Sequence, residues 1–393
     1  MNSPSFQFPY LFDDHHRELS KELDAFVRDN VEPMEHLTAG WDEDRAAMEW
    51  AGILRSSGLA ALCVPRAFGG RSNQVDFRSV CLARETIAWG SGFCDTLFAM
   101  QGLGSYPITL AGTDDQKHRF LPAVARADTL CAFALTEEGA GSDVGGITTQ
   151  AVRTAGGYLV NGRKCFISNA GVADIYVVFA RLEGTEKTNG IVALIITPGD
   201  EGFSIIKRQQ VMAPHPIGIV GFRDCFVPHD RLLGQEGQGF RIAMATLDRF
   251  RPGVGAAALG MGQRAIDEAL HHSQTRVQFG KPLFDFQMVQ AQIATAAVDL
   301  EAARLLVYHA AWHADHAGDR RITLEAAMAK LQATEAAFRA IDTGVQLHGG
   351  NGVLVGSTVE RLYREIRALR IYEGTSEIQR LVIARHLKKE TKT

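Results

Sequence analysis

The chain of 393 residues has few cysteines, and no two of them form a Cys-x-x-Cys pair. The six are scattered along the sequence: Cys63, Cys81, Cys94, Cys131, Cys165 and Cys225. A small disulfide-stapled protein would carry a denser and more regular set. We therefore expect reduced thiols and a cytosolic protein.

The chain also lacks the segments that direct proteins to membranes or out of the cell. No apolar run is long enough to cross a bilayer. The first residues have neither a basic n-region nor an apolar h-region, and they include Asp13 and Asp14. Neither a secretory signal nor an arginine-rich transit peptide fits this composition. We expect a cytoplasmic protein without a membrane span.

Positive charge is not in excess, because 41 Lys and Arg residues stand against 45 Asp and Glu, a net charge of −4. This balance disfavours a nucleic-acid-binding surface.

Few residues are spaced as metal ligands usually are. His313 and His316 stand three residues apart, but no carboxylate or cysteine completes a ligand set, and His271-His272 fits exposed helix surface. We expect neither a nucleic-acid partner nor a bound metal.

Hydrophobic periodicity divides the chain into three regions. Residues 1–128 have mostly helical spacing, as at Leu19, Leu23 and Phe26. Residues 129–236 have strand-like runs at 130–135, 157–160, 163–167, 175–182, 190–197, 203–207 and 217–227. Residues 237–393 are again helical, in segments near 240–273, 284–317, 322–347, 356–367 and 376–389. We expect a mainly helical α+β protein with an N-terminal helical domain, a middle β domain and a C-terminal helical bundle.

Asn161-Gly162 separates two of the strand-like runs in the middle region. Asn-Gly is a strong signal for a two-residue hairpin, because both turn residues need positive φ. The sequence therefore predicts a hairpin turn at these two residues.

Near the C-terminus, Glu373 and Gly374 precede a helix-like segment. Ser376 and Gln379 have the spacing of a capping box, so the helix should begin there. Glu373 then lies on a loop that a packed helix can hold still, as a base that must meet one C–H bond requires.

A glycine-rich loop follows the first strand of the middle region, at residues 136–143. Its glycines miss the G-x-G-x-x-G spacing, and more strand signal follows where a Rossmann loop requires a helix. The Rossmann interpretation therefore fails. What remains is a flexible loop with N–H groups and the hydroxyls of Thr136 and Ser142, which can line a flat heteroaromatic cofactor.

Several of these stretches resemble the acyl-CoA dehydrogenase family, in the order in which the family carries them. They are Thr-Glu-x-x-x-Gly-Ser-Asp at 136–143, Phe-Ile-Ser at 166–168, Arg-Val-Gln-Phe-Gly at 276–280, Gln-x-x-Gly-Gly-x-Gly at 346–352 and Tyr-Glu-Gly-Thr at 372–375. With the helical N-terminal region before them and the helical bundle around the later ones, the resemblance covers essentially the whole chain. The chain departs from the family at two places. Glu138 stands where many members have proline, and the sequence of residues 210–217 differs from the one usual in the family. The contribution of the segment at 213–216 stays open.

The resemblance implies an FAD-dependent acyl-CoA dehydrogenase that oxidises an acyl thioester to the 2-enoyl thioester. Glu373 would be the catalytic base, and its backbone N–H would help to polarise the thioester carbonyl. Implied cofactor-binding residues are Phe133, Leu135, Thr136, Gly141, Ser142, Phe166, Ile167, Ser168, Arg276, Gln278, Phe279, Gln287, Gln346, Gly349, Gly350, Thr375 and Glu377. Implied substrate-binding residues are Ser142, Asp248, Arg251, Gly374 and Arg385.

The same resemblance implies a homotetramer, because the elements at Arg276 and Gly350 reach a neighbouring subunit's FAD in the family. It also implies an electron-transfer flavoprotein as acceptor. Some relatives place the base on the first bundle helix instead, but here that position is Phe250, which cannot accept a proton.

Three alternatives remain beside this interpretation. An acyl-CoA oxidase would pass electrons to oxygen, and nothing in the sequence excludes it. A nitroalkane oxidase relative is disfavoured, because those enzymes carry aspartate at the base position. A non-catalytic, DNA-associated flavoprotein is disfavoured by the acidic balance. The acyl group is not given by the sequence.

Overall fold

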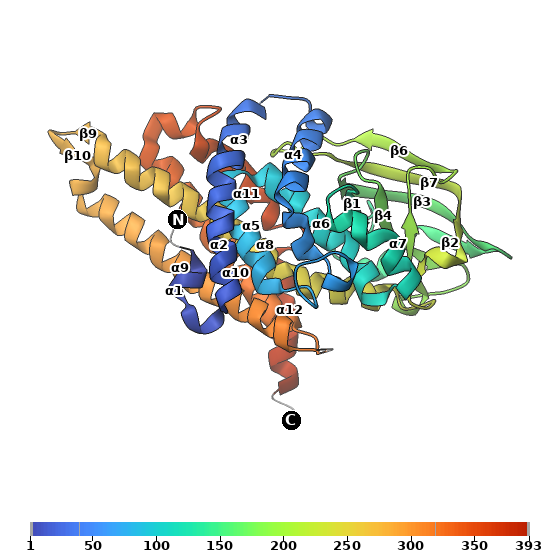
Figure 1. The fold of residues 1–393 in the computed structure, drawn as a ribbon. Coiled ribbons are helices and arrows are strands. Elements are labelled where there is room, and N and C mark those ends of the chain that lie inside the picture. The colour runs from blue at the N-terminus through green and yellow to red at the C-terminus, as the bar shows by residue number, and fades with distance from the viewer. Residues whose placement is uncertain (1–2, 39, 319, 391–393) are drawn as a thin grey trace. The chain divides into compact units, whose positions relative to one another are not determined.

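The computed structural model describes residues 3–38, 40–318 and 320–390 (Figure 1). Its contacts divide the chain into two compact units. Unit 1 takes the chain up to Leu37, Phe77–Asp95 and the chain from Asp248 onward, and unit 2 takes Thr38–Asp76 and Thr96–Leu247. The predicted domain boundaries near 128 and 236 do not coincide with these limits and stay predictions.

Unit 2 is built on a sheet of eight strands in the order β6-β7-β3-β2-β4-β5-β8, with β1 paired to β4 in parallel. The strands are β1 (Cys131–Ala134), β2 (Gln150–Arg153), β3 (Gly157–Ser168), β4 (Ile175–Leu182), β5 (Ile191–Ile196), β6 (Phe203–Arg208), β7 (Ile217–Pro228) and β8 (Leu232–Leu233). Strand β4 is almost wholly buried, as its run of apolar residues requires. Helices α4 (Glu43–Ser57), α7 (Asp114–Ala125) and most of α6 (Gly92–Ala111) belong to the same unit.

Unit 1 is helical. Its helices are α1 (Pro4–Gln7), α2 (Asp14–Phe26), most of α3 (Glu32–Thr38), α5 (Phe77–Gly90), most of α8 (Gly239–Thr275), α9 (Gln287–His316), α10 (Thr323–His348), α11 (Thr358–Leu369) and α12 (Ser376–Glu390). A short hairpin, β9 (Val277–Gln278) with β10 (Lys281–Pro282), follows α8. Helix α5 is buried nearly all round, so it is the core helix of this unit. The predicted mainly helical α+β fold is confirmed.

The predicted hairpin at Asn161-Gly162 is wrong, because β3 runs through both residues without a turn. Gly162 has φ +144° at a register shift between β3 and β7, which is a β-bulge. Asn161 donates from Nδ2 to Asp224 Oδ1 at 3.0 Å and accepts from the Asp224 N–H at 2.8 Å. The Asn-Gly pair thus shapes a bulge, since a cross-strand side-chain bond outweighs the local turn preference.

Among the described residues, no helix is both long and apolar enough to cross a membrane.

Candidate functional site

The Glu373 loop lies between α11 and α12 in unit 1 and holds an unusual backbone. Glu373 has φ +53° and Gly374 has φ +95°. A left-handed conformation is uncommon for a residue other than glycine and persists only where its surroundings fix it. A Cβ on Gly374 would lie 2.5 Å from Nε2 of Gln379, so a larger residue would displace the amide that bonds the carbonyls of this loop.

Side chains from three helices bind the two carbonyl groups of this loop. The Glu373 carbonyl accepts from Arg251 Nε at 2.9 Å and from Gln379 Nε2 at 3.2 Å. The Gly374 carbonyl accepts from Lys330 Nζ at 2.8 Å and from Gln379 Nε2 at 3.0 Å. Helices α8, α10 and α12 therefore fix the position of Glu373.

The carboxylate of Glu373 is left with an unpaired oxygen. Oε2 is buried, and no described residue is hydrogen-bonded to it. Burial raises the pKa of this carboxyl, and the positive charges of Arg84, Arg251 and Lys330 partly offset the rise. A buried carboxylate with a raised pKa and one oxygen that accepts no hydrogen bond is well suited to accept a proton.

Asp248 and Arg251 support this loop from α8. Asp248 Oδ1 accepts from Arg251 Nη1 at 2.8 Å, and Oδ2 accepts from Arg321 Nε at 2.8 Å and from Thr323 Oγ1 at 2.5 Å. The Asp248 carboxylate is thus occupied by protein donors. The substrate-binding roles predicted for both residues stay predictions.

Arg385, a predicted substrate-binding residue, lies away from the Glu373 loop. It is exposed on α12, nine residues beyond Ser376 and so about 14 Å along the helix. At the alternative base position, Phe250 is buried and packs edge-on against Phe77, with ring centroids 5.5 Å apart.

The predicted capping box of α12 is wrong. Ser376 is the first helical residue, and its hydroxyl donates to Glu335 Oε1 at 2.6 Å. Thr375 caps the helix instead, since its Oγ1 accepts from the Ile378 N–H at 3.3 Å. Gln379 holds the loop carbonyls rather than the cap. Glu377 is exposed, with an ion pair to Arg380 at 3.7 Å.

In unit 2, the glycine-rich loop follows β1 and is shaped by Glu137. Its carboxylate accepts from the N–H groups of Thr148 (2.6 Å) and Thr149 (2.9 Å) and from Lys164 Nζ (2.7 Å). Lys164 is fully buried and also donates to the Leu135 carbonyl at 3.0 Å. Although burial opposes its charge, these partners lower the pKa of Glu137 to about 2. The loop is thus anchored at its start.

The predicted cofactor residues of this loop differ in exposure. Leu135 is buried, and Phe133 is half-buried with its ring centroid 4.9 Å from that of Phe179. Thr136 is half-buried, whereas Gly141 and Ser142 are exposed, and nothing lies within 4 Å of a Cβ built on Gly141. Open backbone of this kind can approach a ligand closely.

Phe166, near the end of β3, is the second strained residue of the candidate site. It has φ +55°, lies at a register shift, and leaves 58% of its surface exposed. Its N–H donates to Gln209 Oε1 at 2.9 Å, and Ile167 beside it is buried. The strand therefore turns an aromatic ring outward.

Ser168 ends β3, and its Oγ lies 3.3 Å from Nε2 of His215. His215 belongs to the segment at 213–216 whose contribution the sequence left open. The His215 ring must donate from Nδ1 to the Ala213 carbonyl at 3.1 Å, because a carbonyl can only accept. Burial lowers the pKa of His215, so the ring is neutral and Nε2 accepts the Ser168 hydroxyl proton.

The remaining predicted cofactor residues lie at one end of unit 1. Arg276 joins α8 to the β9–β10 hairpin, Gln278 ends β9, and Phe279 in the turn is 93% exposed. Gln346 lies in the last turn of α10, Gly349 and Gly350 begin the 3-10 turn that follows it, and all three are exposed. Stacked rings of His272 and His348, 4.4 Å apart, join the ends of α8 and α10. Gln287 begins α9 and is exposed.

Sequence reasoning missed the buried charged residues that hold the two loops: Glu137, Lys164 and Lys330. The only available signal was a charged residue inside an otherwise apolar run, such as Lys330 between Ala329 and Leu331. That signal does not identify the partner.

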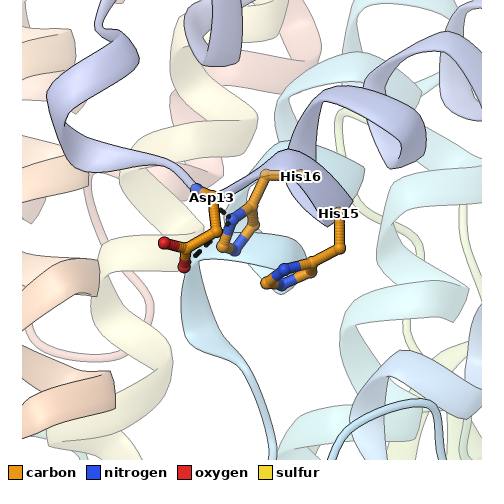
Figure 2. Close-up of side chains that lie close together, drawn as sticks. All are labelled: Asp13, His15 and His16. Carbon is orange, nitrogen blue, oxygen red and sulfur yellow. Dashed lines mark hydrogen bonds and ion pairs between the residues drawn. The ribbon is translucent and has the colours of Figure 1, made fainter.

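Asp13, His15 and His16 also lie close together, at the start of α2 (Figure 2). His16 Nδ1 accepts from the Asp13 N–H at 3.0 Å, and Asp13 Oδ2 pairs with Arg78 Nη2 at 3.0 Å. Helix capping and this ion pair explain the cluster, and we assign it no metal.

Family models cover most of the chain. The N-terminal domain of acyl-CoA dehydrogenases matches residues 13–128, the middle domain 132–225 and the C-terminal domain 237–388. An acyl-CoA dehydrogenase of Bacillus subtilis is 37% identical over 94% of this chain and 97% of its own length. An acryloyl-CoA reductase (NADH) of Anaerotignum propionicum is 40% identical over 84% of each chain. The CarC subunit of the caffeyl-CoA reductase–Etf complex of Acetobacterium woodii is 39% identical over 94% of this chain and 95% of its own length.

Solved structures agree with these matches. Butyryl-CoA dehydrogenase from Megasphaera elsdenii has a TM-score of 0.89 at 35% identity, covering 96% of this chain and 98% of its own. An acyl-CoA dehydrogenase from Bacillus anthracis complexed with FAD has a TM-score of 0.86 at 29% identity, covering 97% of this chain and 68% of its own. The chain therefore belongs to the acyl-CoA dehydrogenase family of flavoprotein oxidoreductases, which act on CH–CH bonds.

Proposed function

We propose that this protein catalyses FAD-dependent α,β-dehydrogenation of an acyl-CoA thioester to the 2-enoyl-CoA, with Glu373 as the base. The observation that carries the proposal is the buried Oε2 of Glu373, which has no hydrogen-bond partner among the described residues, on a loop that Arg251, Lys330 and Gln379 hold in place. Such a carboxylate is preorganised to accept one proton.

The residues of unit 2 fit FAD as the cofactor. Phe166 offers an exposed ring for stacking on a flat heteroaromatic, and its positive φ turns that ring outward. Gly141 offers open backbone and Ser142 a hydroxyl. Ser168, at the end of the strand that carries Phe166, offers a second hydroxyl. At the end of unit 1, Arg276 offers a charge-assisted donor for a pyrophosphate. The neighbour from Bacillus anthracis that is complexed with FAD supports this assignment.

The protein's own contribution to the reaction is proton transfer and positioning. Glu373 takes the α-proton at its carboxylate as that C–H bond breaks, and the electron pair left on the α-carbon forms the double bond. The Glu373 N–H polarises the thioester carbonyl and so makes the α-proton more acidic. FAD, when bound, supplies the acceptor for the hydride that leaves the β-carbon. Atoms and electrons balance, since the substrate loses one proton and one hydride.

The same groups can work in reverse. Protonated Glu373 would then return a proton to the α-carbon of an enoyl-CoA. Similarity to the acryloyl-CoA and caffeyl-CoA reductases favours this second candidate function. Because one relative is a subunit of an Etf complex, an electron-transfer flavoprotein is the partner we propose. Oxygen consumption during turnover would instead indicate an acyl-CoA oxidase.

A homotetramer that shares FAD between subunits completes the proposal. Apolar side chains are exposed at the end of unit 1 that carries the β9–β10 hairpin, including Phe279, Val353 and Val355. Arg276→Ala should lower FAD retention if this end binds a neighbour's cofactor. A stable monomer that holds FAD normally would contradict the shared site.

The test of the proposed base is Glu373→Gln, which keeps size and polarity but cannot accept the α-proton. We expect this variant to retain FAD and bind acyl-CoA, while flavin reduction slows by several orders of magnitude. Rapid mixing with straight, branched, cyclic and aromatic acyl-CoAs, followed by flavin bleaching, measures the loss and identifies the acyl group. Bleaching close to that of the unmodified protein would show that the proton goes elsewhere.

A further inference from the structure

A single carboxylate, that of Glu335 on α10, is bonded to both ends of the loop that carries Glu373. At the start of the loop, Arg370 Nε donates to Glu335 Oε1 at 3.0 Å, and Arg370 Nη2 lies 2.9 Å from Oε2. At the end of the loop, the Ser376 hydroxyl donates to Glu335 Oε1 at 2.6 Å. Arg370 is the C-cap residue of α11 and Ser376 the first residue of α12, so Glu335 joins these two helix ends.

The side chains around Glu335 favour a charged and well-oriented carboxylate. Its side chain is 17% exposed, and Ser376 is buried. Arg370 is held from a second direction, because its guanidinium carbon lies 4.5 Å from the ring centroid of Phe338 on the same helix as Glu335. Although burial opposes the charge, the hydrogen bonds from Ser376 and Arg370 lower the pKa of Glu335. An ionised carboxylate makes stronger hydrogen bonds than a neutral group.

The loop between these ends, residues 371–375, has a backbone that needs such support. The Ser376 N–H donates to the Arg370 carbonyl at 3.1 Å and closes the loop. Within it, Glu373 has φ +53° and Gly374 has φ +95°. A residue other than glycine keeps a left-handed conformation only where its surroundings fix it. Ends held together by one side chain restrict the conformations that Glu373 can adopt.

We propose that Glu335 is a positioning residue for the proposed base. By joining the two ends of the loop, its carboxylate holds Glu373 at the backbone conformation from which Oε2 accepts the α-proton. Lys330 on the same helix bonds a carbonyl in the middle of the loop. Helix α10 thus holds the loop at its middle and at both ends. The inference rests on the proposed role of Glu373.

Glu335→Ala should slow flavin reduction at saturating acyl-CoA by about tenfold to hundredfold, because a displacement of the base of about 1 Å is enough for such a loss. The loss should lie in the limiting rate constant rather than in the acyl-CoA concentration that gives half of it. Glu335→Gln should restore part of the rate, since its amide oxygen can still accept one of the bonds. Rapid mixing of the FAD-loaded proteins, with the acyl-CoA that bleaches the unmodified protein fastest, measures these constants.

Ser376→Ala and Arg370→Met each release one end of the loop. If Glu335 acts by joining the ends, either variant should slow flavin reduction nearly as much as Glu335→Ala does. Combining Ser376→Ala with Glu335→Ala should then cost little more, because both changes break the same connection. A Glu335 that only balances the charge of Arg370 would leave the rate of Ser376→Ala unchanged.

The backbone of the loop gives a readout that needs no turnover. The N–H groups of Ile371 and Tyr372 donate to the Ala368 carbonyl at 2.9 and 3.0 Å, and that of Ser376 closes the loop. These groups should lose protection from hydrogen exchange in Glu335→Ala, as measured by mass spectrometry of peptides that span the loop.

Asp299→Ala is the matched control. Asp299 Oδ2 accepts from Arg339 Nε at 3.1 Å and from Nη2 at 2.7 Å, in an ion pair that joins α10 to α9 rather than to the loop. Its loss removes one carboxylate partner of α10 and should leave the limiting rate and the exchange of the loop unchanged.

Slower flavin reduction and faster exchange in the Glu335 and Ser376 variants, with neither change in the control, would support the inference. An unchanged rate in Ser376→Ala, unchanged exchange in Glu335→Ala, or equal changes in the control would overturn it. If Glu335→Ala does not fold, Ser376→Ala carries both measurements, because it removes only one hydroxyl. Flavin reduction that survives in Glu373→Gln would instead defeat the proposed function, while hydrogen exchange would still test the connection between the loop ends.

Discussion

The Glu373 loop of unit 1 and the glycine-rich loop of unit 2 each depend on one buried lysine, but the two lysines are compensated differently. Lys164 Nζ bonds a carbonyl, that of Leu135, and also the Glu137 carboxylate. Lys330 Nζ bonds the Gly374 carbonyl, and no described carboxylate forms an ion pair with it. Burial lowers the pKa of each lysine to about 8.

This difference assigns the two lysines different roles. The charge of Lys164 is neutralised by its direct partner, so Lys164 serves the shape of the loop. The charge of Lys330 has no such partner among the described residues, and it favours the ionised form of Glu373, whose pKa it lowers. The same residue type is therefore structural in one unit and electrostatic in the other.

The largest expected effect comes from removing Lys164 from its ion pair with Glu137. Lys164→Met leaves Glu137 charged and buried without its cation, which should cost about 3–5 kcal/mol of unfolding free energy. The loop that Glu137 shapes should loosen and release FAD. Denaturant unfolding and the flavin content of the purified protein measure both effects.

Glu137→Gln combined with Lys164→Met is the control for that experiment. The double variant removes the uncompensated charge and should recover much of the lost stability. Equal destabilisation in the single and double variants would show that the pair has no special part in holding the loop.

Lys330→Met should give the contrasting result. Gly374 keeps its bond from Gln379, so the unfolding free energy should change by only about 1 kcal/mol. Removing the positive charge raises the pKa of Glu373, and the proposed base must be ionised to accept a proton, so flavin reduction should slow at acid pH. Lys330 itself loses its charge as pH rises through about 8, so the variant and the unmodified protein should converge above that pH. A pH-independent rate loss would contradict the electrostatic role.

Local patterns in the sequence predicted much of this molecule. Strands β4 to β7 lie within a few residues of their predicted ranges, because alternating and apolar runs report burial directly. Glu373 and Gly374 were identified beside a helix start, which the structure confirms at Ser376. These features depend on neighbours in the chain.

Features that depend on distant partners were missed. Asn161 is hydrogen-bonded to Asp224 on the neighbouring strand, so the residues predicted to form a turn form a β-bulge instead. Ser376 bonds Glu335 on α10, so the cap moved to Thr375. The pairs that hold the two loops join residues that periodicity cannot connect, since a buried lysine looks like an exposed one until its partner is known.

An effect smaller than that of Lys164→Met should follow from Phe166→Ala. The exposed ring is the stacking surface proposed for FAD, and its loss should weaken FAD binding by about 1–3 kcal/mol, or roughly fivefold to 150-fold in Kd. Phe166→Tyr keeps a ring at the same backbone conformation and should bind FAD nearly as well. Titration of the apoprotein with FAD, followed by flavin fluorescence, compares them. Equal affinity of the alanine variant would remove Phe166 from the cofactor site.

The smallest effect concerns the hydrogen bond between Ser168 and His215. At 3.3 Å it is long, and it joins neutral groups, so its coupling energy should be about 0.5 kcal/mol, or about twofold in the Kd for FAD. His215→Ala lets the Ser168 hydroxyl rotate, whereas the unmodified ring accepts its proton and directs the remaining lone pairs of Oγ. Single and double variants with Ser168→Ala form a cycle that isolates this term in FAD titrations. Strictly additive effects would mean that His215 does not orient Ser168 toward the cofactor, and that the segment at 213–216 serves the protein in another way.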